Sequence, residues 1–224
     1  MLKLEKTEVV GWEAAIRGMR NPMNSWEQSD TDYEKCYNTA YELPPQIGPN
    51  DHGLMEKLRN AGTDHRKFMR MIEVYVDITA PLYWWKEFDT YKVGTVANSC
   101  STMHKIAAKE FTFDDFSHEK LINSACMEIQ EQHILLSPIQ TLATTIECLN
   151  SYRDLYLQTK DKKYWWQMIQ LLPSSYNQKR TVMLNYEVLA NMYKSRKGHR
   201  LDEWKTLLDW IKTLPYSDLI TGGK

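Results

Sequence analysis

The sequence lacks the short motifs that mark the most familiar enzyme classes. It contains no GxGxxG, no GxxxxGK[S/T], no HExxH and no GxSxG, so it offers no local pattern for a dinucleotide turn, a phosphate loop, a zinc protease helix or a nucleophile elbow. Its apolar runs fall far short of the roughly 20 residues that a membrane helix needs. The formal net charge of -1 gives no basic field for nucleic acid. These absences predict a protein with neither a nucleic-acid partner nor a membrane span.

Cysteine is scarce, and none of it is paired in a CxxC motif. The chain has four cysteines, which are Cys36, Cys100, Cys126 and Cys148, and its first residues MLKLEKTEVV have no secretory pattern. This usage favours a reducing compartment, so we expect a cytoplasmic protein. Cys100 stands between two serines, but the sequence fixes no histidine beside it. A buried, inert thiol is therefore favoured over a nucleophile.

The chain is long and apolar enough for one large core. With 224 residues and 42% apolar content, we expect a single domain spanning residues 1–224. The stretch MIEVYVDIT alternates between apolar and polar residues and predicts a half-buried strand over 72–78. The three prolines and two glycines of 43–53 predict a loop, and a short helix is expected to follow from Leu54 to Gly62.

Helical patterns dominate the remainder, and from about Ser137 the chain is expected to be nearly continuous helix. Pro81 fits the first turn of a helix that should run until Gly94. Later helices are predicted around an apolar stripe at three- and four-residue spacing, in KKYWWQMIQLLP, after a short strand in TVMLNYEVLANMYKSRKGHR, and after a capping Asp202. The stripe comprises Ile139, Leu142, Ile146 and Leu149. Together with the strands, these helices define an α+β protein with a small antiparallel sheet and a helical carboxy-terminal half.

Two groups of side chains each allow a functional and a structural interpretation. Asp115, His118 and Glu119 stand at helical spacing that could ligate a divalent metal, yet helix openings also recruit acidic residues for the macrodipole. The structural role is favoured, and no metal ligand is predicted. The pairs Trp84–Trp85 and Trp165–Trp166 could stack on bases, but within helical patterns they favour core or subunit contacts.

The stretch GTDHRKFMRMIEVYVDITAPLYWWKEFDTYKVGTVANSCS, residues 62–101, resembles the central segment of the flavin-dependent thymidylate synthases. That family has a His-containing loop, an alternating strand, an Ala-Pro pair that opens a helix, and a signature Arg-His-Arg-x-x-Ser-x-Asn-Glu-x-Ser-x-Arg. His65 falls on the family's flavin-contacting histidine and Glu87 on a glutamine. Within the signature, Thr90, Tyr91 and Lys92 fall on Arg-His-Arg, and Thr95 falls on the first serine. After a one-residue insertion, Asn98 falls on the asparagine and Ser101 on the second serine.

A second stretch carries the resemblance independently. LLPSSYNQKRTVMLNYEVLANMYKSR is similar to the family's Leu-Pro, short strand, and helix bearing Asn-x-Arg-x-x-x-Asn-x-x-x-x-Arg, and it places Asn185, Asn191 and Arg196 on the two asparagines and the final arginine. The resemblance covers residues 50–210, most of the chain. It implies the fold of the flavin-dependent thymidylate synthases. The same asparagines, Asn98 included, could instead cap turns and helix ends.

The departures from the family pattern fall on its phosphate-binding arginines. At those positions this chain has Thr90, Met103, Ile169 and Glu187, and Ser99 replaces the signature glutamate. Losing one charge-assisted contact costs about 1.5–3 kcal/mol, and Glu187 is expected to repel phosphate. Either the site has lapsed or other cations rebuild it. The candidates for rebuilding are Lys92, Arg196, Arg17, Arg20, Lys179 and Arg180, and the segment Arg17–Trp26 either covers the site or is a solvated loop.

The resemblance implies a reductive methylation of dUMP, or of a related pyrimidine nucleotide, to dTMP. The implied cofactor is FAD, with methylenetetrahydrofolate and NADPH as co-substrates, in a homotetramer. The flavin would be bound by His65, Lys92, Thr95, Asn98, Asn185 and Asn191; Glu87, Ser101 and Arg196 would bind the nucleotide, with Ser101 and Arg196 as catalytic candidates. The alternative is a nucleotide-binding, flavin-binding or structural protein whose catalytic site has lapsed.

Overall fold

The computed structural model describes residues 2–34, 43–123, 128–129, 132–133 and 136–222 of the chain. The strands are β1 (Lys3–Val10), β2 (Glu73–Pro81), β3 (Val96–Ser99), β4 (Glu128–Ile129), β5 (Gln132–His133) and β6 (Asn177–Asn185). The helices are α1 (Trp12–Arg20), α3 (Pro49–Asn60), α4 (Leu82–Phe88), α5 (Thr102–Lys105), α6 (Pro138–Thr159), α7 (Lys162–Leu171), α8 (Tyr186–Arg196), α9 (Asp202–Ile211) and α10 (Asp218–Thr221). Short 3-10 turns are η1 (Asn21–Met23), η2 (Trp26–Gln28), η3 (Lys67–Arg70) and η4 (Phe113–Asp115).

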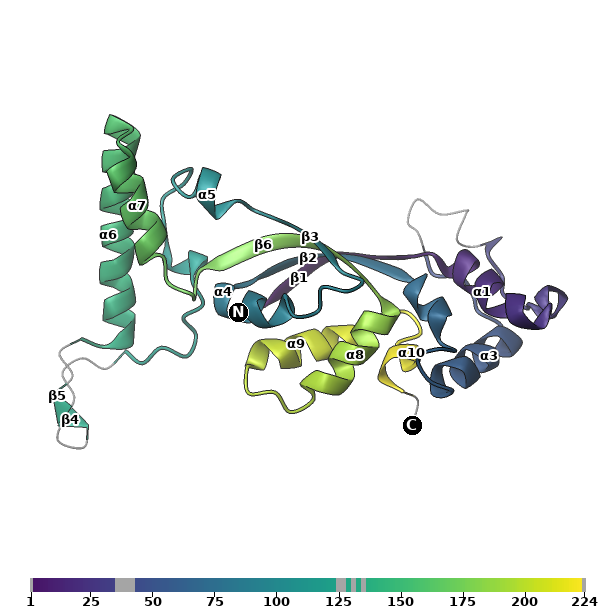
Figure 1. Ribbon diagram of the computed structural model, residues 1–224. Helices are drawn as coiled ribbons and strands as arrows, with labels where there is room; N and C mark the ends of the chain where they lie inside the picture. Colours follow the sequence, from purple (N-terminus) through teal and green to yellow (C-terminus); the bar gives the residue numbers. More distant parts are fainter. Residues whose placement is uncertain (1, 35–42, 124–127, 130–131, 134–135, 223–224) are drawn as a thin grey trace. The chain divides into compact units, whose positions relative to one another are not determined.

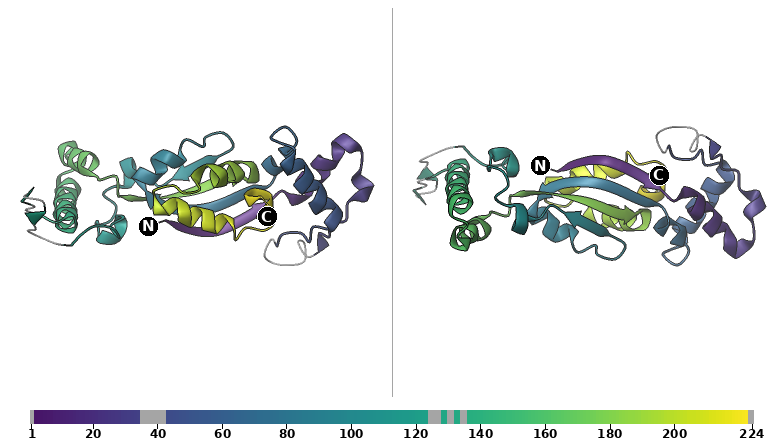
Figure 2. Two further views of the ribbon diagram at one scale, coloured as in Figure 1. Left: turned by 90° about the horizontal axis from the view of Figure 1, so that it is seen from below. Right: turned by 90° about the horizontal axis from the view of Figure 1, so that it is seen from above.

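The expected α+β class is confirmed, with a four-stranded antiparallel sheet in the order β1-β2-β6-β3 (Figures 1 and 2). The predicted alternation of β2 is confirmed, because Val74, Val76 and Ile78 are buried while the residues between them are not. The edge strands β1 and β3 have no apolar-polar alternation, and β3 is exposed along its whole length. A strand whose faces are both partly solvated leaves no period-two pattern, so the sequence did not reveal these two.

The chain divides into two compact units, each assembled from several segments. Unit 1 contains residues 79–87 and 99–180, and unit 2 contains residues 2–78, 88–98 and 181–224. The expectation of one domain over 1–224 stays a prediction.

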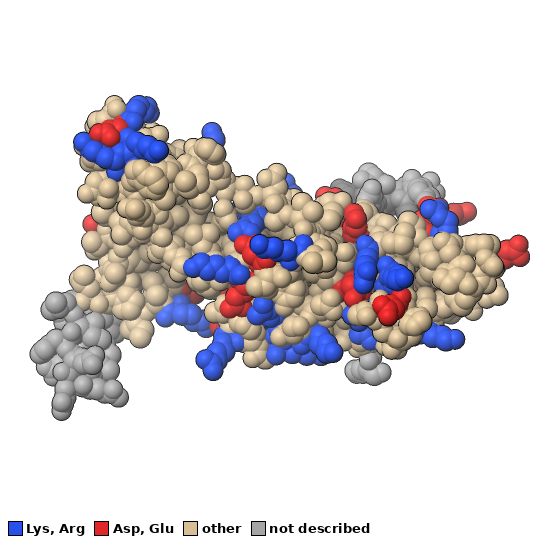
Figure 3. All heavy atoms as spheres, viewed as in Figure 1, with Lys and Arg blue, Asp and Glu red and all other residues tan. Residues whose placement is uncertain are grey.

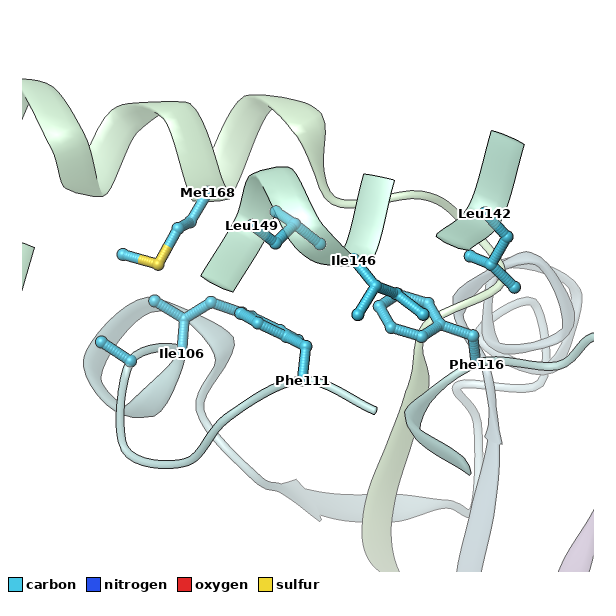
Figure 4. Close-up of a cluster of buried hydrophobic side chains, with 8 residues drawn as sticks. Ile106, Phe111, Phe116, Leu142, Ile146, Leu149 and Met168 are labelled. Carbon is cyan, nitrogen blue, oxygen red and sulfur yellow. The ribbon is translucent and has the colours of Figure 1, made fainter. Parts of the chain in front are cut away.

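Unit 1 is built around the antiparallel pair α6 and α7, which lie side by side in Figure 1. The predicted stripe of α6 is confirmed, since Leu142, Ile146 and Leu149 are buried against Phe111, Phe116 and other apolar side chains (Figure 4). Trp84 and Trp85 are also fully buried, as the core interpretation predicted, whereas Trp166 remains 42% exposed.

Unit 2 is organised around α8, which packs against α9, α10 and η3. The first residue of α8, Tyr186, is fully buried and stacks edge-to-face with Trp12 at a ring-centroid distance of 5.4 Å. Its hydroxyl donates to the Pro215 carbonyl, which ties the carboxy-terminal segment to the helix. Burial raises the pKa of Tyr186, and the nearby Asp218 carboxylate raises it further, so this hydroxyl remains a donor.

Four predicted boundaries are wrong. The loop expected over 43–53 already becomes helix at Pro49, because proline suits the first helical position and Gly48 supplies the extended residue before it. Pro81 ends β2 instead of opening a helix, and α4 stops at Phe88, before the expected end at Gly94. Asp202 is the first residue of α9 and not its cap, which is Leu201.

The structure also bears on the predictions about membrane-spanning helices and cysteines. In the part of the chain that the structure describes, no helix combines the length and apolarity needed to cross a bilayer. Cys100 and Cys148 are free thiols, while Cys36 and Cys126 lie outside the described residues. Cys100 is exposed, so the burial expected of an inert thiol is wrong.

The segment after α1 is held by a buried ion pair. Arg20, which is 3% exposed, donates from Nε to the fully buried Asp51 carboxylate at 2.6 Å. The other Asp51 oxygen accepts from the Ser29 and Thr31 hydroxyls at 2.7 and 2.6 Å. Burial alone would raise the pKa of Asp51, but the hydrogen bonds from Thr31, Ser29 and Arg20 outweigh it and lower that pKa below its ordinary value. Arg20 is therefore committed to the fold and is withdrawn from the list of phosphate-binding candidates.

Replacing Asp51 with Asn should strongly destabilise the protein, because it leaves the Arg20 guanidinium buried without its counter-charge. Breaking such a pair costs about 3–5 kcal/mol of unfolding free energy, measurable by urea denaturation at pH 7. The lowered pKa means that the carboxylate stabilises the fold above its unfolded pKa of about 3.9 and loses this effect as pH falls. The wild type should therefore lose stability between pH 5 and the acid limit more steeply than Asp51→Asn.

Arg17→Gln is the matched control, since Arg17 is exposed and lies 3.9 Å from Glu13 on the same helix. Its cost should stay below about 1 kcal/mol. Equal costs for the two substitutions would contradict a structural role for the Arg20–Asp51 pair.

Candidate functional site

The candidate site in unit 2 begins at the buried start of α8. Asn185 is the N-cap residue, and its side-chain Oδ1 accepts the Val188 backbone N–H at 3.0 Å. The preceding peptide is fixed as well, because the Tyr186 N–H donates to the Ile72 carbonyl at 3.1 Å. Asn185 is only 9% exposed. Its carbonyl oxygen therefore caps a helix, as the structural alternative proposed, while its amide nitrogen remains as a donor.

The loop of residues 89–95 packs directly on this helix start. Gly94 has a φ of +81°, and a Cβ at this position would lie 3.1 Å from Asn185 Nδ2 and 3.0 Å from Val188 Cγ2. The positive φ favours glycine, and a Cβ here would also crowd the two side chains. The hydroxyl of the next residue, Thr95, donates to the Tyr91 carbonyl and closes the turn.

A second loop reaches the same helix through Arg66. The Arg66 Nε lies 2.7 Å from Glu187 Oε2, in a pair whose side chains are 17% and 8% exposed. The Arg66 Nη2 also donates to Asn191 Oδ1 at 3.3 Å, one helical turn farther along. Glu187 thus has a cationic partner, and it lies in the first turn of α8, where the helix dipole favours a carboxylate. The phosphate repulsion expected from Glu187 is correspondingly offset.

The far end of α8 contacts the first loop again. Arg196 donates from Nε to the Tyr91 hydroxyl at 2.9 Å, and its guanidinium lies 4.4 Å from the centroid of the Trp204 ring. This cation–π contact and the hydrogen bond to Tyr91 hold the guanidinium over the Trp204 ring.

The structure thus brings two loops onto one helix, but it treats the predicted side chains differently. Asn185, Asn191, Arg196 and Thr95 take part in the contacts described above. His65, Lys92 and Asn98 are exposed, and Lys92 makes no ion pair with any residue that the structure describes. Arg66 was missed by the sequence analysis, although it is adjacent to His65.

The remaining predicted residues belong to unit 1. Ser101 caps α5 by accepting the His104 N–H at 3.0 Å, and Glu87 lies in α4. Two of the positions that lack the family's arginines are also here. Ile169 packs against the apolar cluster of α6 and α7, which explains why an uncharged residue suits it. Met103 is 48% exposed, and its carbonyl accepts the Trp165 indole N–H at 3.2 Å.

Of the proposed rebuilding cations in unit 1, Arg180 already has partners. Its guanidinium lies 4.1 Å from the Trp85 ring centroid, and its Nε donates to Gln178 Oε1 at 3.0 Å. Lys179 is likewise engaged through at least one interaction. Arg17 remains exposed in unit 2, beside Glu13.

Two of the three residues considered from the sequence as metal ligands, Asp115 and His118, make other contacts. Asp115 closes a capping box with Thr112 and pairs with Lys109, while the His118 ring contacts the Phe116 carbonyl through Nδ1 at 2.8 Å. Within the described part of the chain, one other cluster brings a histidine and two carboxylates within 4.8 Å, namely His52, Glu56 and Asp218. The pairing of His52 with Asp218 at 2.9 Å joins α10 to α3.

The hydrogen-bond donors and cations around α8 are of the types that a flavin dinucleotide requires. A flavin presents ring carbonyls and a diphosphate, which call for amide donors and cations. The exposed Lys92 ammonium can meet a phosphate, while the Asn98 and Asn191 amides and the Asn185 Nδ2 can meet carbonyl oxygens.

Comparison by sequence finds no matching protein-family model and no matching curated protein. Solved structures do match. The flavin-dependent thymidylate synthase ThyX from Helicobacter pylori, solved with FAD and dUMP, aligns with 98% of this chain and 97% of its own, at a TM-score of 0.65 and 15% identity. The UMP/dUMP methylase PolB from Streptomyces cacaoi, solved with 5-Br UMP, aligns with 99% of this chain and 93% of its own, at a TM-score of 0.58 and 13% identity. The chain therefore has the fold of the flavin-dependent thymidylate synthases, as the resemblance implied.

A double-mutant cycle on Arg66 and Glu187 should reveal strong coupling. Arg66→Gln leaves a buried carboxylate without its counter-charge and should cost about 3–5 kcal/mol of unfolding free energy, whereas Arg66→Gln with Glu187→Gln should cost much less than the two single changes added together. Urea denaturation of the four proteins measures the coupling.

The exposed pair Asp209–Lys212, at 2.8 Å, provides the matched control. Its coupling should not exceed about 1 kcal/mol. A coupling at Arg66 and Glu187 no larger than this would show that the pair is not the anchor of the second loop.

Proposed function

We propose that the chain is a flavin-dependent methylase of a pyrimidine nucleotide, with dUMP as the first candidate substrate. The observation that carries this proposal is the fold likeness over nearly the whole length of two enzymes, one solved with FAD and dUMP and the other with 5-Br UMP. The arrangement of unit 2 supports it, because two loops and α8 gather amide donors and cations of the kind that a flavin and a nucleotide require.

The reaction transfers the methylene group of methylenetetrahydrofolate to carbon 5 of the uracil ring and reduces it to a methyl group. NADPH supplies the two electrons, so the products are dTMP, tetrahydrofolate and NADP. FAD, when bound, supplies the hydride carrier for this reduction. The protein's residues need to bind and orient the reactants and exclude water, and no protein nucleophile is required.

Distinct roles follow for the predicted residues. Lys92 would neutralise a phosphate of the flavin, and His65, Thr95, Asn98, Asn185 and Asn191 would bind its polar edges. Arg196, held over the Trp204 ring, would meet the nucleotide. Ser101 and Glu87, in unit 1, keep their predicted roles in nucleotide binding. Arg66 would add to this set by keeping Glu187 neutralised, so that an incoming phosphate does not meet an uncompensated carboxylate.

A second candidate function is a nucleotide-binding, flavin-binding or structural protein that has lost turnover. It is favoured by the commitment of Arg66 to Glu187 and by the packing of Ile169 into an apolar cluster. In this case the fold and the loop geometry persist without enough cationic contacts to hold both ligands. A cytoplasmic homotetramer is part of the first proposal, and mass measurement in solution would test the oligomer.

The purified protein should retain FAD. We expect flavin absorbance between 300 and 550 nm after FAD addition and desalting, at about one flavin per chain, and formation of dTMP when dUMP, methylenetetrahydrofolate and NADPH are supplied. Lys92→Gln should weaken FAD binding by roughly tenfold or more, since a charge-assisted contact contributes about 1.5–3 kcal/mol.

Lys212→Gln removes an equal charge at the exposed Asp209 pair and should leave FAD binding unchanged. Retained FAD without turnover of dUMP or UMP would support the second candidate function. A protein that keeps no FAD would refute the first.

A further inference from the structure

Unit 1 contains a pocket whose lining includes Met103 but none of the residues predicted to bind the flavin or the nucleotide. It has a volume of about 480 Å³ and is formed by α5, the residues that follow it, and the adjoining ends of α6 and α7. Its lining includes Ile106, Ala107, Tyr156, Lys160, Lys162 and Trp165. This volume lies within the range that small organic ligands occupy.

The pocket has a fixed aromatic side and an apolar base. The Trp165 indole N–H donates to the Met103 carbonyl at 3.2 Å, which holds the orientation of the ring. Tyr156 supplies a second ring, and both aromatic residues pack against the buried cluster that includes Ile106 and Ala107. Rings that are already oriented can stack on a flat ligand at little entropic cost.

Two lysines bring positive charge to the same pocket. The Lys160 ammonium lies 5.9 Å from the Tyr156 ring centroid, and the Lys162 ammonium lies 5.9 Å from that of Trp165. Neither forms an ion pair with a residue in the described ranges. The acidic residue between them, Asp161, is paired with Lys163 at 3.1 Å and caps α7. Figure 3 shows basic side chains gathered at this end of α6 and α7.

We propose that this pocket binds a flat aromatic ring linked to a phosphate or carboxylate group. The ring would pack against Trp165 and Tyr156, and the anionic group would meet Lys160 and Lys162. An uncharged ring would leave the lysines without a partner, and a bare anion would leave the aromatic side uncovered. The combination selects ligands that have both parts. His104, which also lines the pocket, adds a hydrogen-bonding group.

Calorimetric titration of the full chain tests this assignment with four probes. UMP joins a ring to a phosphate, 4-aminobenzoylglutamate joins a ring to carboxylates, uridine is a ring alone, and inorganic phosphate is an anion alone. At least one of the first two should bind at least tenfold more tightly than uridine and phosphate. Which of them binds more tightly identifies the anionic group.

Variants locate the binding. Lys160→Gln with Lys162→Gln should weaken the preferred probe at least tenfold, whereas Lys163→Gln, in the same turn but outside the pocket lining, should change its affinity less than twofold. Trp165→Phe retains an aromatic ring but loses the contact with the Met103 carbonyl, and it should weaken binding by a smaller factor. Because the lysines are exposed, their substitution should leave the protein folded. Circular dichroism of each variant checks this.

Failure of both ringed anions to bind would overturn the proposal. Binding of the preferred probe that is unchanged in the Lys160→Gln, Lys162→Gln protein would also overturn it, because that probe would then occupy another site. FAD retention and dTMP formation are measured separately, so the pocket can fail while the proposed methylase activity stands, and the reverse also holds.

Discussion

The hydrogen bond from the Val188 N–H to Asn185 Oδ1 fixes the start of α8, and the candidate site of unit 2 depends on that start. Gly94, at a positive φ, lies close against the same asparagine, and Glu187, in the first turn, receives Arg66. Both loops are therefore positioned by one helix end that is buried and capped. A site built on such an end inherits its rigidity, because the helix cannot shift without exposing Tyr186.

The charges around α8 are arranged differently from what residue identity alone implied. Glu187 is paired with a guanidinium from another part of unit 2, and Arg196 donates to the Tyr91 hydroxyl and lies over the Trp204 ring. In unit 1, Ile169 packs against an apolar cluster and carries no charge. Lys160 and Lys162 bring positive charge to the turn between α6 and α7. The loss of individual arginines therefore does not measure the loss of anion binding. The positions of the cations in the folded protein determine whether an anion can bind.

The sequence was informative where burial imposes a period and uninformative where contacts join distant segments. The alternation of Val74, Val76 and Ile78 predicted the central strand because one face is buried, and the fixed spacing of Asn185, Asn191 and Arg196 predicted the helix that organises unit 2. The exposed β3 left no period to detect. The Arg66–Glu187 pair left none either, since complementary charges far apart in sequence carry no local pattern.

That pair also constrains which substitutions the chain tolerates. An arginine introduced at position 187 by a single substitution would bring two guanidinium groups together in a largely buried place and set a positive charge in the first turn of a helix, where the dipole opposes it. An engineered arginine at this position therefore needs a compensating change at position 66.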